Sequence, residues 1–121
     1  MADHERTLSE EEQAVILALL AQDLPGVDEL RAQVPEVIVL RRCGCGCATR
    51  DLGPGTARRS DASPVRDGVL VSASVTGRGD GVLLFVKDGY LSCLEVYSLD
   101  DDPAPLPRVQ DLVIDPVDTH E

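Results

Sequence analysis

The chain has 121 residues, 43% of them hydrophobic, which is enough for the core of one domain. It contains no tryptophan, one phenylalanine and two tyrosines, so aliphatic side chains must fill that core. No stretch approaches the roughly 18 consecutive apolar residues of a membrane-spanning helix, and the opening "MADHERTLSE" lacks the basic start and apolar run of a secretory signal. We therefore expect a cytoplasmic protein that does not bind membranes and whose cysteines stay reduced.

The formal net charge of −11 lies mostly at the two ends of the chain. Residues 1–12 contain five acidic residues and one arginine, and residues 99–121 contain seven acidic residues and one arginine, which leaves −1 for residues 13–98. Acidic ends repel the phosphates of nucleic acids and attract basic surfaces. We expect no nucleic-acid binding and a basic protein as the partner, with solvated ends that bind nothing as the alternative. The oligomeric state is left open.

Two helices are predicted before the first strand. Ser9, followed three residues later by Glu12, forms a capping-box pattern, and the acidic residues around it suit the positive end of a helix dipole. Residues 14–21 are apolar almost all round, which predicts a well-buried helix that the Leu-Pro-Gly turn at 24–26 ends. Apolar residues at helical spacing over residues 27–34 predict a second, short helix.

The pattern changes to strands after residue 35. "EVIVLRRC" is rich in β-branched residues, "VLVSASVTG" alternates apolar and polar residues, and "VLLFV" and "LSCLEVYSL" flank the turn "KDGY". The intervening "TRDLGPGTARRSDASPVRDG" is rich in glycine, proline, serine and arginine, so most of it is predicted as loop. These segments predict an antiparallel β-meander of about four strands.

The Asp88-Gly89 turn sets the expected register of the last hairpin. Both central residues of a type I′ turn need positive φ, for which Asp-Gly is a preferred pair. Counting outward from this turn places Leu84 opposite Cys93. Both faces of the hairpin are apolar in the middle, so we expect it to lie centrally in the sheet and to be covered on both sides, at least in part. The helices would cover one face, and the apolar residues of the tail, Leu106, Val109, Leu112 and Ile114, part of the other.

Together these elements predict an α+β fold in which the two N-terminal helices pack on the antiparallel meander. We expect a flexible N-terminus over residues 1–8 and a single domain over residues 9–99. An acidic, proline-containing tail over residues 100–121 should be partly docked.

The stretch "RRCGCGCATR" places Cys43, Cys45 and Cys47 two residues apart, with glycine between them. On an extended strand the outer two Cα atoms would lie about 13 Å apart, whereas thiolates bound to one zinc ion lie about 3.8 Å apart. Only a turn at the glycines would therefore gather the three thiols around one metal. Cys93 is the remaining thiol, so the candidate zinc ligands are Cys43, Cys45, Cys47 and Cys93.

Two other interpretations of these cysteines stay open. Arginines near the motif lower the pKa of a thiol, which favours a thiol-redox protein, although no Cys-x-x-Cys pattern is present. The cysteines are otherwise small residues packed at a strand end, with Cys93 in the core. The flanking arginines themselves form a candidate site for an anion or a partner, or they pair with the acidic ends of the chain. These residues are Arg41, Arg42, Arg50, Arg58 and Arg59.

No known catalytic pattern occurs in the sequence, which contains no GxSxG, HExxH or phosphate-loop motif. We therefore expect no catalytic residues and a non-enzymatic interaction or accessory module. An immunity-type protein that masks a basic toxin surface is one specific form of this expectation. A zinc-binding or thiol-redox protein is the alternative.

The segment "GVLLFVKDGYLSCLEVYSLDDDPAPLP" resembles small uncharacterised proteins of high-GC Gram-positive bacteria. They share an apolar strand, an Asp-Gly turn, a Leu-Glu-Val-Tyr-Ser strand and an acidic tail. "RCGCGC" resembles their cysteine-rich strand, although Ala48 stands where these proteins have proline, and ten arginines against one lysine suit a high-GC genome. The resemblance covers roughly residues 36–107 and bears on the fold; it carries no functional residue to this chain.

Overall fold

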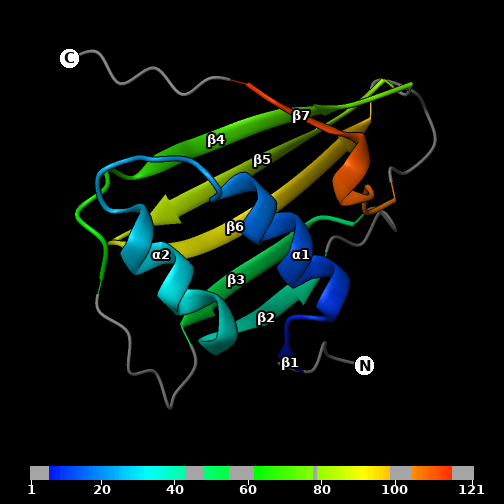
Figure 1. Ribbon diagram of the computed structural model, residues 1–121. Helices are drawn as coiled ribbons and strands as arrows, with labels where there is room; N and C mark the ends of the chain where they lie inside the picture. Colours follow the sequence, from blue (N-terminus) through cyan, green and yellow to red (C-terminus); the bar gives the residue numbers. More distant parts are fainter. Residues whose placement is uncertain (1–5, 43–47, 55–61, 78, 99–104, 116–121) are drawn as a thin grey trace.

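The computed structural model describes residues 6–42, 48–54, 62–77, 79–98 and 105–115. Two helices pack on one face of a twisted, seven-stranded antiparallel sheet (Figure 1), which confirms the predicted α+β class. In chain order the elements are β1 (Arg6–Thr7), α1 (Glu10–Leu19), α2 (Val27–Gln33), the 3₁₀ helix η1 (Val34–Glu36), β2 (Val37–Arg42), β3 (Arg50–Pro54), β4 (Gly68–Val75), β5 (Asp80–Lys87), β6 (Tyr90–Ser98), the 3₁₀ helix η2 (Val109–Asp111) and β7 (Leu112–Ile114). Within the described ranges, no helix is both long and apolar enough to cross a membrane.

Helix α1 begins where the capping-box pattern predicts. The Ser9 hydroxyl accepts a hydrogen bond from the Glu12 N–H at 3.1 Å, and the Glu12 carboxylate accepts one from the Ser9 N–H at 2.9 Å. At the other end, Arg31 of α2 donates to the carbonyls of Leu20 at 2.9 Å and Gln22 at 3.0 Å. Carbonyls at a helix C-terminus lack partners within the helix, so Arg31 both ends α1 and holds α2 beside it.

The sheet has the strand order β1-β2-β3-β6-β5-β4-β7, and every neighbouring pair is antiparallel. The expected number of about four strands was too low. Strand β3 lies in the Gly- and Pro-rich stretch that we predicted mainly as loop, and it is inserted between β2 and β6. The edge strands β1 and β7, of two and three residues, extend the sheet beyond residues 9–99 at both ends of the chain.

The turn between β5 and β6 has the predicted conformation. Asp88 has φ 56° and Gly89 has φ 85°, the left-handed values that a type I′ turn requires. Asp88 is the only described residue other than glycine with a positive φ. Next to the turn, Lys87 pairs with Tyr90 as expected.

Beyond the turn, a β-bulge in β6 shifts the register of the hairpin. Cys93 lies opposite Phe85, not opposite Leu84, so the expected pair was wrong by one residue. Because side chains alternate between the faces of a sheet, this shift moves Leu94 and Val96 to the helix-covered face, where both are fully buried. It moves Cys93 to the opposite face.

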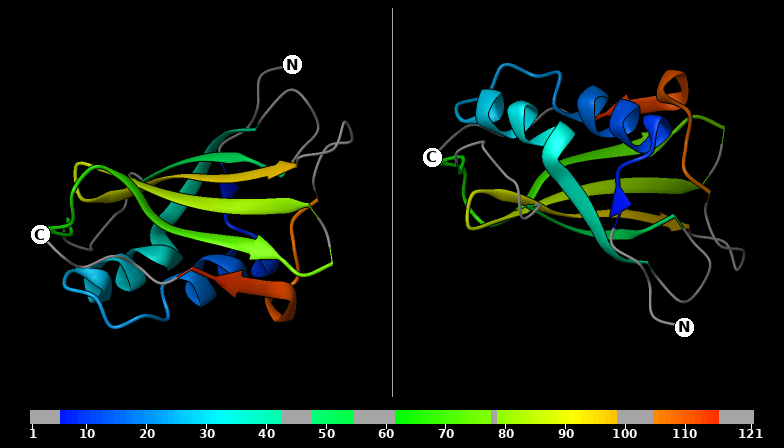
Figure 2. Two further views of the ribbon diagram at one scale, coloured as in Figure 1. Left: turned by 90° about the horizontal axis from the view of Figure 1, so that it is seen from above. Right: turned by 90° about the horizontal axis from the view of Figure 1, so that it is seen from below.

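The C-terminal segment, residues 105–115, covers the same face of the sheet as the helices. Leu106, Leu112 and Ile114 pack against the core beneath α1 and α2, and Figure 2 shows η2 and β7 on the helix side of the sheet. We had expected this segment to cover the opposite face. It does not, because β7 pairs with the edge of β4 and brings η2 beside α1. The opposite face therefore carries no described helix.

Buried polar contacts hold the end of the β5–β6 hairpin. Gln33 of α2 donates to the Gly89 carbonyl at 2.8 Å and accepts from the Leu91 N–H at 3.1 Å. The Ser63 N–H donates to the same carbonyl at 2.8 Å, and the Ser63 hydroxyl donates to the Gly26 carbonyl at 2.7 Å. Since Gln33 is only 3% exposed, these bonds satisfy groups that water does not reach.

Candidate functional site

Of the four predicted thiol ligands, the structure describes Cys93. Cys43, Cys45 and Cys47 lie outside the described residues, so the four-thiolate zinc site stays a prediction. Cys93 is half-buried on β6, opposite Asp51 of β3 and Phe85 of β5. In the described part of the chain, no three His, Cys, Asp or Glu side chains are grouped closely enough to hold a metal ion.

The surroundings of Cys93 keep its thiol protonated. Burial, and after it the negative charges of Asp51 and Glu95, raise the pKa of this thiol to about 11. The thiolate is the form that attacks disulfides and binds metals, so at neutral pH Cys93 is a weak nucleophile. A thiol-redox function needs the opposite shift, and Cys93 does not provide it.

The predicted arginine site is divided between the two faces of the sheet. Arg58 and Arg59 lie outside the described residues. On β2, Arg41 is exposed and lies opposite Asp51, and Arg42 lies opposite Arg50 of β3. Since neighbouring residues of a strand alternate in direction, Arg50 points to the helix side and Arg41 to the other side.

Arg50 meets the buried Glu12, which joins three elements of the fold. The Glu12 carboxylate accepts two hydrogen bonds from Arg6 of β1, both at 2.9 Å, and lies 3.2 Å from Nε of Arg50. Burial of Glu12 opposes its ionisation, but the hydrogen bonds from Arg6 and the Ser9 N–H and the charges of both arginines lower the pKa of Glu12 to about 2. Arg50 thus pairs within the chain, and the three side chains tie β1, α1 and β3 together.

The outward side of α1 is a surface that the sequence analysis missed. We expected α1 to be buried almost all round, but Leu17 is 42% exposed, and Ala14 of α1 and Ala21, two residues beyond its end, also face solvent. Residues three and four apart share one side of a helix, so Ala14, Leu17 and Ala18 form an apolar strip that Ala21 continues past the end of the helix. We call it the α1 stripe: Ala14, Leu17, Ala18 and Ala21.

A groove of about 330 Å³ lies beside the α1 stripe. Glu11, Ala14 and Val15 form its α1 wall, and residues 106–110 of the C-terminal segment form the other. Val109 of this second wall is 40% exposed. The groove therefore continues the apolar surface of the stripe toward η2.

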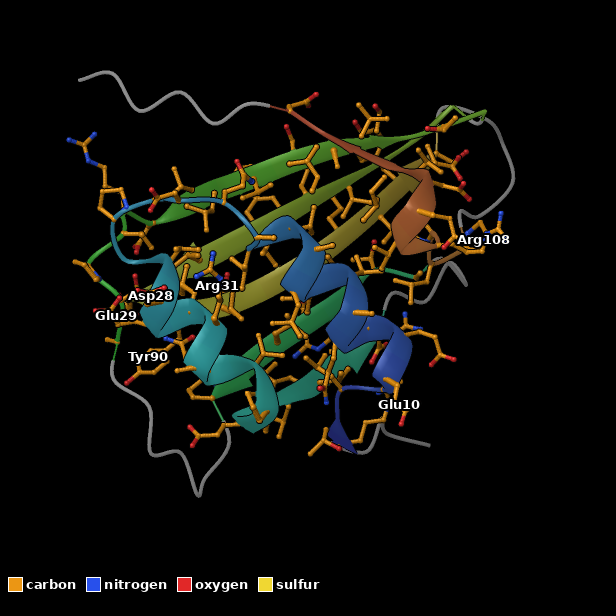
Figure 3. All side chains as sticks on the ribbon, viewed as in Figure 1. Glu10, Asp28, Glu29, Arg31, Tyr90 and Arg108 are labelled. Atoms are coloured by element: carbon orange, nitrogen blue, oxygen red, sulfur yellow. The ribbon has the colours of Figure 1, made fainter. Side chains whose placement is uncertain are left out.

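The helix layer around the stripe is acidic. Residues 10–36 contain seven acidic residues and one arginine, Arg31, which pairs with Asp28 at 2.8 Å. Figure 3 shows Glu10 at the start of α1 and Asp28 and Glu29 at the start of α2, at opposite ends of this layer. Nearby, Arg108 pairs with Asp111 of its own segment at 3.2 Å. The layer thus offers an apolar strip within a field of negative charge.

Apolar patches with polar rims are typical of interaction surfaces, and the α1 stripe with the acidic residues around it has this form. The sequence could have indicated this surface, because a helix in the outer layer of a two-layer fold must expose one side, and residues 14–21 contain no polar side to expose. No known protein-family model, curated protein or solved structure matches this chain.

Proposed function

We propose that this chain is a non-enzymatic interaction module of the cytoplasm that binds a basic protein partner through the outer surface of α1. The observation that supports this most directly is the α1 stripe, an apolar helix side left in solvent within an acidic layer. The apolar side of a helix is normally packed against another element. Charges at the rim of an interface select the partner and speed its approach, so a rim of carboxylates favours lysine and arginine on the partner.

The shape of the surface fits a partner helix. Alanine at three of the four stripe positions lets another backbone come close, while Leu17 projects between them. The groove next to the stripe accommodates an apolar side chain from the partner as an anchor. A basic amphipathic helix meets both requirements, because it presents an apolar side to the stripe and its cations to the acidic rim.

A labelled peptide tests this proposal. A helical peptide of leucine and lysine, with one apolar side, should bind the wild-type chain, and Leu17→Lys should weaken binding at least about tenfold, a loss of about 1.4 kcal/mol. The control is Val69→Lys, the same kind of change on the opposite face of the sheet, which should leave binding unchanged. Fluorescence anisotropy measures all three affinities.

Equal binding by wild type and Leu17→Lys would contradict the proposal, and so would equal binding of a leucine–glutamate peptide of the same length. The natural partner can then be sought by cross-linking in cells with the same variants. A basic protein captured by the wild type and by Val69→Lys, but not by Leu17→Lys, is the expected result. A toxin-like gene next to the gene for this chain would favour the immunity-type form of the proposal.

A further inference from the structure

The face of the sheet opposite the helices carries three of the six large apolar side chains that are exposed in the described residues. Leu40, Val69 and Tyr97 are between 39% and 52% exposed, and Leu83 and Phe85 are half-buried between them. We call this surface, defined by these five side chains, the open face. Figure 2 shows α1, α2 and the C-terminal segment on the other side of the sheet.

The open face is flattened by two of its own side chains. The ring of Tyr97 on β6 lies over Gly81 of β5, in the space where a Cβ at Gly81 would stand. In the same way, Leu40 of β2 lies over Gly53 of β3, where an added Cβ would be 2.8 Å from Leu40 Cδ1. Side chains that lie along the sheet leave a surface suited to a second flat surface.

The charge of the open face decides which occupant fits it. This side of the sheet has a net charge of −1, from Arg41, Lys87, Asp51, Glu95 and Asp115, whose carboxylate accepts a hydrogen bond from Ser72 there. Residues 10–36 on the helix side carry −6, or −4 when Arg6 and Arg50, the partners of Glu12, are included. A basic partner therefore gains the most favourable electrostatic energy by binding to the helix layer. Two copies of a chain with a net charge of −11 repel each other least where their facing charges nearly balance, and that is the open face.

We propose that a second copy of this chain covers the open face, with the two sheets packed face to face around a two-fold axis. The five strands β2, β3, β6, β5 and β4, with up to eight or nine residues each, span roughly 24 Å by 26 Å, or about 600 Å² per copy. A typical specific interface buries about 800 Å² per partner. The dimer should therefore be reversible and should dissociate on dilution.

Sedimentation equilibrium between about 2 µM and 1 mM tests this proposal, a range that brackets dissociation constants typical of weak interfaces. In moderate salt, the wild-type mass should rise from 13.0 kDa toward twice that value. Val69→Asp should lower the association constant at least about tenfold, whereas the matched change Leu17→Asp on the helix layer should leave it unchanged. Val69→Thr keeps the β-branched shape and should cause a smaller loss in the association constant. It tests the same contact if Val69→Asp fails to fold.

Isotope-filtered nuclear Overhauser effects in a mixed labelled sample should connect Phe85 of one copy with open-face residues of the other. A wild-type chain that stays at its monomer mass at 1 mM would overturn the proposal. Loss of the dimer in Leu17→Asp but not in Val69→Asp would overturn it as well. The inference is independent of the proposed function, because peptide binding to the α1 stripe is measured at concentrations where the chain is a monomer.

Discussion

At the scale of single residues, Glu12 ties three elements of the fold together, since it lies on α1 and pairs with Arg6 of β1 and Arg50 of β3. Its side chain is 5% exposed, and its carboxylate accepts hydrogen bonds from Arg6 and lies 3.2 Å from Nε of Arg50. Glu12→Gln leaves two arginines without their counter-charge, so we expect a loss of about 2–4 kcal/mol in the free energy of unfolding. Asp28→Asn, in the exposed pair with Arg31, is the control and should cost less than about 0.5 kcal/mol. Urea unfolding measures both, and equal losses would contradict the role of Glu12.

The same residue predicts how stability depends on pH. The pKa of Glu12 falls from 4.5 to about 2 on folding, so the unfolded chain binds this proton more readily than the folded chain. The contribution of Glu12 to stability is therefore fully present above about pH 4.5 and is lost as the pH falls toward 2. Between these values the wild type should lose up to about 3 kcal/mol more than Glu12→Gln. Parallel stability curves for the two proteins would rule this out.

Cys93 should be a slow thiol. In a variant with serine at positions 43, 45 and 47, Cys93 is the sole thiol, and its raised pKa of about 11 should slow alkylation at neutral pH about 100-fold relative to an unperturbed cysteine. Asp51→Asn removes one of the charges that raise this pKa, so it should speed the reaction. Mass spectrometry of iodoacetamide-treated samples gives the rates. A rate at or above that of glutathione would restore the thiol-redox interpretation for Cys93.

Hydrogen bonds between residues close in the sequence were predictable at this scale, whereas ion pairs between residues distant in the sequence were not. Ser9 and Glu12 stand three residues apart, so their reciprocal hydrogen bonds follow from helix geometry alone. The pairing of Glu12 with Arg50 depends on β3 passing beneath the start of α1, which no local pattern specifies. The flanking arginines could be identified as a group, but which of them faces the helices follows only from the strand register.

At the scale of elements, the β5–β6 turn depends on glycine for two reasons that can be separated. Gly89 has φ 85°, and a Cβ there would lie 2.6 Å from the Ser63 carbonyl oxygen. Gly77 has φ 77° but open space around it, so Gly77→Ala adds only backbone strain, about 1–2 kcal/mol. Gly89→Ala adds the same strain and also displaces Ser63, so it should cost clearly more. Thermal unfolding of both variants checks this order. Equal losses of stability would contradict it and show that Ser63 moves away from the added Cβ at no measurable cost.

The elements that the sequence predicted are those with a local cause. The capping box, the proline-bounded second helix and the Asp-Gly turn each depend on residues a few positions apart. The bulge in β6 does not, and it reversed the faces of Cys93 and Leu94 although the turn was placed correctly. Strand β3 was missed because its glycine and proline favour loop, whereas pairing with β2 on one side and β6 on the other holds it in the sheet.

At the scale of the whole molecule, the two layers present surfaces of different character. The helix side combines the α1 stripe with an excess of acidic residues, seven against one arginine over residues 10–36, and the open face combines apolar side chains with nearly balanced charge. The sequence could show that the chain is acidic and that both hairpin faces are apolar. It could not show which face is left uncovered, because that depends on β7 pairing with β4 and carrying the C-terminal segment to the helix side.

This difference predicts opposite responses to salt. Binding of a basic peptide to the acidic helix layer is an attraction that salt screens, so raising NaCl from about 50 mM to 500 mM, which shortens the Debye length from roughly 14 Å to 4 Å, should weaken it several-fold. Self-association brings together two chains of net charge −11, a repulsion that the same salt screens, so the dimer should tighten over this range. Anisotropy for the peptide and sedimentation for the dimer, in the same buffers, measure the two slopes. A peptide affinity that does not fall with salt would contradict the acidic helix layer as its binding site, and a dimer that weakens with salt would contradict the predicted screening of like charges between the two copies.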